Sequence, residues 1–161
     1  MARALINRLM LIALMAVAPA LHAVAAEPPP GSLYARMGGE VVVKKLVNVT
    51  IDDVTADHHL KRSFKDTNLQ RIKDKLVEQI CFLAGGACTY TGDPMREVHA
   101  GHQISESEFY GMVEVLRQNM IDLHIGLAER NELLALLAPM KRDVVDVPAP
   151  PAPKQPAAAA D

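Results

Sequence analysis

The chain has 161 residues, with 17 Lys and Arg against 19 Asp and Glu, and only 4% of its residues are aromatic. This mildly acidic balance argues against nucleic acid as the main partner, because phosphate binding needs an excess of basic residues. Two ends of distinct composition leave residues 27–147 as the central segment. That length suits one domain with its own core and excludes a multidomain enzyme.

The two ends differ in composition from the rest of the chain. Residues 1–26 predict a secretory signal peptide, because two Arg precede an apolar stretch too short to span a bilayer, and small residues follow it. The alternative is an uncleaved membrane anchor. We expect an exported, periplasmic protein that is not an integral membrane protein once the signal is cleaved. Residues 27–31 are a Pro-rich linker, and residues 148–161 are typical of a disordered tail.

The first part of the central segment predicts two helices. Ser32 can cap a short helix over 33–37, which Gly38 and Gly39 stop. Residues 40–55 form an apolar-rich run whose length favours a helix over a strand, although many of its residues are β-branched.

A third helix runs from a cap at Thr67 or Asn68 to about residue 84. Its apolar residues recur every three or four positions and form one stripe, comprising Leu69, Ile72, Leu76, Ile80 and Leu83. Gln79 projects inside this stripe and Lys75 lies at its edge.

The last part predicts an irregular stretch followed by two helices. Residues 87–104 are rich in turn formers, and Ser105 with Glu108 predicts a capping box for the helix behind them. A final helix over about 128–147 should kink at Pro139. The fold class is all-α, with four substantial helices and a loop-rich middle.

Few residues carry chemistry. Cys81 and Cys88 predict either a disulfide, worth roughly 2–3 kcal/mol, or two free buried thiols. No CxxCH motif is present, which excludes c-type haem attachment. His99 lies among apolar residues, where it is either a satisfied core histidine or a ligand for a metal or haem.

The order and spacing of several short motifs resemble the group I truncated haemoglobins. These motifs are Gly38-Gly39, Gly85-Gly86, Tyr90-Thr91-Gly92, Met95, His99 and Ile104, with Phe64 followed by Asp66-Thr67-Asn68-Leu69. The resemblance covers about residues 32–145, so that residues 32–147 would form a truncated-globin haem domain.

The resemblance implies a two-over-two helical sandwich around haem b. His99 matches the proximal ligand of the iron, and its second ring nitrogen needs a hydrogen-bond acceptor. The residues expected around the cofactor are Phe64, Ile72, Lys75, Leu76, Met95, His99, Ile104 and Phe109, with Val98 and Val113 beside them. Met140 and Lys141 stand where some relatives carry a reactive histidine, so we expect haem bound without a covalent link.

This sequence departs from the family on the distal side. Ile51 stands where the family places a Tyr, and family glutamines would map near Ile72 and Leu76. Bound oxygen would therefore lack these hydrogen-bond donors, which puts tight oxygen storage and nitric oxide dioxygenation in doubt. Lys75 has three alternatives: a ligand to the iron, a partner of a haem propionate or water, or a donor to bound gas.

Two functional hypotheses follow. The first is an exported haem b protein of the oxygen-binding and transport class, which binds oxygen, nitric oxide or carbon monoxide. The second is a haem redox enzyme or electron-transfer protein that acts on nitric oxide, nitrite or peroxide, with a reductase or cytochrome partner and Lys75 as a displaceable distal ligand. A haem-free helical sensor is a third reading. The spectrum of the purified protein distinguishes them.

Overall fold

The computed structural model describes residues 28–146, and all of its regular elements are helical. In chain order they are α1 (Leu33–Arg36), α2 (Gly39–Ala56), the 3₁₀ turn η1 (Lys61–Phe64), α3 (Leu69–Leu83), α4 (Met95–His99), α5 (Glu106–Asp122), α6 (Leu127–Leu137), the 3₁₀ turn η2 (Ala138–Met140) and α7 (Lys141–Val144). The predicted signal peptide and Pro/Ala-rich tail lie outside the described residues.

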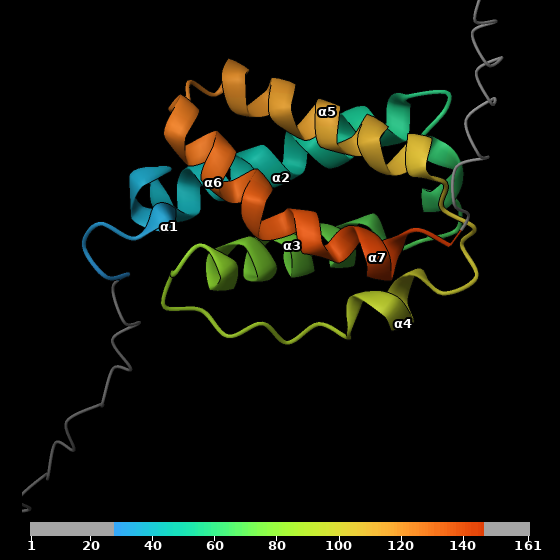
Figure 1. Cartoon of the computed structure of the whole chain (residues 1–161), viewed down its shortest axis with the longest axis horizontal. Helices are drawn as coiled ribbons and strands as arrows, with labels where there is room; N and C mark the ends of the chain where they lie inside the picture. Colours follow the sequence, from blue (N-terminus) through green and yellow to red (C-terminus); the bar gives the residue numbers. More distant parts are fainter. Residues whose placement is uncertain (1–27, 147–161) are drawn as a thin grey trace, which may run out of the picture.

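Helix α2 is the centre of the fold. It packs against α3 on one side and α5 on another, while α1 contacts both α2 and α6 (Figure 1). Helix α6 in turn contacts α5. The short helices α4 and α7 contact each other, on the side of the N-terminal end of α3 in Figure 1. The predicted all-α, two-over-two arrangement is confirmed: α2 and α3 form one pair, and α5 and α6 form the other.

The apolar pattern of α2 explains its central place. Val43, Leu46, Ile51 and Val54 recur at helical spacing and have no exposed surface. The β-branched residues lower the helix propensity only slightly. Burial of each such side chain contributes about 1.5–3 kcal/mol, which outweighs that preference.

The predicted helix starts are present. The Ser32 hydroxyl accepts a hydrogen bond from the Ala35 amide, and of the two candidates for the start of α3, Asn68 is the residue at the cap. At α5 both halves of the capping box form: the Glu108 amide donates to Ser105 Oγ, and the Ser105 amide donates to Glu108 Oε2.

The final helix differs from the expectation of one kinked helix over 128–147. Pro139 has no N–H to donate, and the chain tightens there into η2 before α7 continues as far as Val144. Val145 is extended, and the Asp146 amide donates to the carbonyl of Ile104 at 3.0 Å. The chain therefore leaves the helix to bind the loop that precedes α5.

Candidate functional site

A largely apolar cavity of about 340 Å³ lies between α2, α3, α4 and α5. All eight residues proposed from the sequence line it: Phe64, Ile72, Lys75, Leu76, Met95, His99, Ile104 and Phe109. Ile51, from α2, and Val98, from α4, line it too. Glu108, Phe109 and Met112 of α5 line the cavity, but Val113 does not line it as expected, because the residue after Met112 points about 100° away along the helix.

His99 is the last residue of α4, and its ring is already oriented. Helix α4 begins after Pro94, whose carbonyl accepts the amides of Glu97 and Val98. His99 Nδ1 lies 2.7 Å from the carbonyl oxygen of Met95. Since a carbonyl only accepts, Nδ1 is the donor in this hydrogen bond, and Nε2 is the ring nitrogen left for a ligand. A metal-bound histidine is held by the same kind of hydrogen bond.

Lys75 lies at one side of the cavity, where Glu78 and Thr91 hold its amine. Lys75 Nζ is 2.7 Å from Glu78 Oε1 and also donates to Thr91 Oγ1. Glu78 Oε2 accepts hydrogen bonds from the Thr91 amide and hydroxyl, at 3.0 and 2.8 Å. The hydrogen bond from Lys75, followed by those from Thr91, lowers the pKa of Glu78 to about 2. We call Lys75, Glu78 and Thr91 the clasp.

Gln79 of α3 lines the cavity and contacts α4 and η2. The residue is only 6% exposed, and its side-chain amide nitrogen lies 3.4 Å from the sulfur of Met95 and 3.7 Å from that of Met140. Because thioether sulfur is a weak acceptor, these contacts orient the methionines more than they stabilise the amide. The polar residue noticed inside the apolar stripe of α3 thus lies against α4 and η2.

Arg62, in η1, ties down the loop between α4 and α5. It donates to the carbonyls of His102 and Gln103, at 3.1 and 3.0 Å, and to the carboxylate of Glu108. Burial alone would raise the pKa of Glu108, but hydrogen bonds from Ser105 and Arg62 outweigh it, so that the pKa is lowered. No local pattern indicated these contacts, since Arg62 and Glu108 are 46 residues apart.

The lining of the cavity suits an apolar group that carries acidic substituents. Ser63 Oγ is buried without a hydrogen-bond partner among residues 28–146, and Ser63 lines the cavity next to Phe64. Arg71 and His102 also line it and supply basic groups for carboxylates. Within the same residues, no three His, Cys, Asp or Glu side chains gather as a metal site. An iron held by a porphyrin and by His99 alone fits this donor set.

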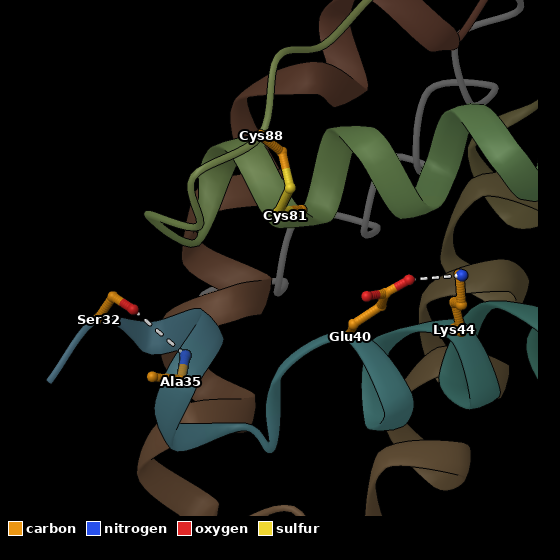
Figure 2. Close-up of a disulfide and its surroundings, with 6 residues drawn as sticks. All are labelled: Ser32, Ala35, Glu40, Lys44, Cys81 and Cys88. Carbon is orange, nitrogen blue, oxygen red and sulfur yellow. Dashed lines mark hydrogen bonds and ion pairs between the residues drawn. A yellow bond between two sulfur atoms is a disulfide. The ribbon is translucent and has the colours of Figure 1, made fainter. Parts of the chain in front are cut away.

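Cys81 and Cys88 form a disulfide, which decides between the two alternatives left by the sequence. Their Cα atoms lie 5.9 Å apart, and Cys81 is fully buried. Figure 2 shows the bridge joining the end of α3 to the segment that follows the helix. That segment continues to Thr91, so the disulfide fixes the chain close to the clasp.

The fold and the cavity define a small helical protein of the globin class. A family model described as Bacterial-like globin matches residues 32–146. The chain is 31% identical to the group 1 truncated haemoglobin GlbN of Mycolicibacterium paratuberculosis over 115 residues, which are 71% of this chain and 85% of that protein. It is 27% identical to the group 1 truncated haemoglobin of Tetrahymena pyriformis, covering 72% of this chain and 96% of that protein.

The structure also superimposes on solved truncated haemoglobins. The crystal structure of the Tetrahymena pyriformis protein in its Fe(III) form matches with a TM-score of 0.68 and 26% identity, over 71% of this chain and 97% of that one. The chain belongs to the Bacterial-like globin family and, within it, to the group 1 truncated haemoglobins. Proteins of this family bind haem and small gas molecules. Within residues 28–146, no helix is both long and apolar enough to cross a membrane.

Proposed function

We propose that this protein is an exported haem b protein that binds a diatomic gas, with His99 as the proximal ligand of the iron. One observation carries the proposal: the hydrogen bond from Nδ1 of His99 to the Met95 carbonyl, which leaves Nε2 free at an apolar cavity. Bound haem would supply an iron with an open sixth position for the gas. The described residues would hold the imidazole, exclude water and supply basic side chains for the carboxylates of the haem.

The side chains that line the cavity influence which gas binds most tightly. Ile51, Ile72 and Leu76 present hydrocarbon where the family resemblance places hydrogen-bond donors. Oxygen bound to ferrous haem carries partial negative charge and needs such a donor for a slow release. Carbon monoxide carries less charge and needs a donor less. We therefore expect oxygen to leave quickly, and an oxygen transport role would depend on that fast release.

Export is part of the same proposal. Disulfides persist in oxidising compartments and are rare in the cytosol, so Cys81–Cys88 supports a periplasmic location. Fractionation of cells expressing the chain with and without residues 1–26 tests this. Recovery of both forms in the cytosol would contradict export.

The experiment that tests haem binding is the absorption spectrum of the purified protein, in ferric and ferrous states. His99→Ala should lose the imidazole-ligated signature and recover it when free imidazole is added. His58→Ala is the matched control, since His58 is exposed, lies outside the lining of the cavity and should keep the native spectrum. An unchanged spectrum in His99→Ala would refute the proposed site.

A second candidate function is a haem redox enzyme acting on nitric oxide, nitrite or peroxide, supplied by a reductase or cytochrome. The observation that favours it is an amine at the cavity wall, since Lys75 could act as a displaceable ligand. A low-spin, six-coordinate spectrum that Lys75→Ala converts to an open one would favour this candidate.

A further inference from the structure

Residues 88–93 run beside α3 in the opposite direction and are joined to it at three levels. The joined pairs, in order, are Cys81 with Cys88, Glu78 with Thr91, and Arg71 with Asp93. This segment is also a wall of the cavity, which Tyr90, Gly92 and Asp93 line. The disulfide at one end of the segment therefore helps to hold Thr91 over Glu78.

Gly92 allows this wall of the cavity, residues 88–93, to pack closely against the ring of Tyr90. A Cβ at this position would overlap the ring of Tyr90, which folds back so that its hydroxyl donates to the Asp93 carbonyl at 3.0 Å. The ring thus packs on the bare backbone of the segment. The position of the wall is consequently set by local contacts as well as by its bonds to α3.

Glu78 is the centre of the clasp. One carboxylate oxygen accepts two hydrogen bonds from Thr91 and also faces the Lys75 amine at 2.9 Å, while the other oxygen faces that amine at 2.7 Å. The Lys75 and Glu78 side chains are 28% and 31% exposed, so water screens this ion pair only in part. Lys75 is thereby held by a carboxylate and a hydroxyl on the side of the wall.

Among residues 28–146, Lys75 is also the only lysine that lines the cavity. Its neighbours there, Ile72 and Leu76, offer no group that could hold an amine. A lysine side chain is long and flexible enough to turn from the clasp towards the cavity. Its position therefore depends on the strength of the clasp.

We propose that Glu78 is the positioning residue that holds Lys75 on the wall and keeps the iron's sixth position open to gas. This inference rests on the proposed function and concerns the regulation of the same site. Glu78 is not among the residues that line the cavity, so it would act through Lys75. Thr91 is the second holder of the amine, and the wall segment carries it.

The test compares spectra of haem-loaded variants. Glu78→Gln with Thr91→Val removes the charge and the hydroxyl that hold Lys75 while preserving side-chain size. We expect this double variant to gain a low-spin, six-coordinate fraction and to bind carbon monoxide roughly tenfold more weakly, because the open fraction falls. Adding Lys75→Met to the double variant should restore the open spectrum. Glu40→Gln is the matched control.

Glu40 serves as the control because it pairs with Lys44 on α2 and lies outside the lining of the cavity (Figure 2). The Glu40→Gln variant should have the same spectrum as the native protein. An unchanged spectrum in the double variant would overturn the inference. So would a native protein that is already low-spin and that Lys75→Met alone converts to an open form, since that result places the amine on the iron.

Lys75→Met by itself keeps the inference testable if the double variant does not fold. It should leave the coordination state seen in the native spectrum unchanged, because the clasp already keeps the amine away from the iron. Failure of the proposed function is recognised separately, by a purified protein without haem or by an unaltered His99→Ala spectrum. If haem is bound through His99 but the Glu78→Gln, Thr91→Val double variant has the native spectrum, only the inference about Glu78 fails.

Discussion

Reduction of the Cys81–Cys88 disulfide should destabilise the protein by an amount that the structure allows to be estimated. The two cysteines are seven residues apart, so the bridge closes a loop of about eight residues. The loss of loop-closure entropy in the unfolded chain then corresponds to about 2.5 kcal/mol at 25 °C. For a domain of this size, that free energy lowers the melting temperature by about 10 °C.

The assay is thermal and urea unfolding of the haem-loaded protein, followed by far-UV circular dichroism, with and without a thiol reductant. Cys88→Ser is the matched variant, because it opens the bridge and leaves the buried Cys81 in place. It should unfold at the temperature of the reduced native protein and should not respond to reductant. The urea midpoint should fall with little change in slope.

Coincident melting curves for oxidised and reduced protein, within about 2 °C, would refute this reasoning. That result would mean that contacts within the reduced chain already confine the segment after α3. In that case the wall of the cavity would owe its position to Glu78, Thr91 and Tyr90, and not to the bridge.

Three further predictions address the cavity and its supports. Ile72→Gln should slow oxygen dissociation roughly tenfold in stopped-flow displacement by carbon monoxide, because one hydrogen bond to the bound gas contributes about 1–1.5 kcal/mol; an unchanged rate would place Ile72 away from the gas. Arg62→Met removes the ties to Glu108 and to two loop carbonyls, and should speed haem transfer to an excess of apo-globin about tenfold, whereas equal rates would contradict a role in holding the loop. The pKa of Glu78 is lowered from 4.5 to about 2 in the folded protein, so the stabilisation that depends on its charge is present above about pH 4.5 and is lost as the pH falls towards 2. The difference in urea stability between the native protein and Glu78→Gln should therefore be constant above pH 5 and shrink below it, and a difference that grows on acidification would show the opposite sign of coupling.

Local signals in the sequence predicted the helices well, because helix ends are set by contacts three or four residues apart. Ser32, Asn68 and the Ser105–Glu108 pair each bond within one turn, so their roles could be read directly. Pro139 likewise predicted the break before α7, since it lacks an N–H. The end of that helix was misjudged because it depends on a bond from Asp146 to a distant loop.

The cavity residues could be predicted from two sources together. The apolar stripe of α3 indicated which face is buried, and the family resemblance indicated that His99, Met95 and Phe64 meet that face. Periodicity alone could not distinguish a cavity wall from an ordinary helical core, because both demand apolar side chains at the same spacing. Only the folded chain shows that these side chains surround a space.

The sequence by itself determined the all-α class, the caps and the apolar faces, because each depends on residue type and on neighbours within a turn. It indicated His99 as the candidate ligand only through the family resemblance. The tertiary structure decided which partner Lys75 takes, because Thr91 reaches it from 16 residues away. It also decided whether the two cysteines pair and which loop Arg62 holds. Those contacts depend on the path of the chain between the partners, and residue type alone does not set that path.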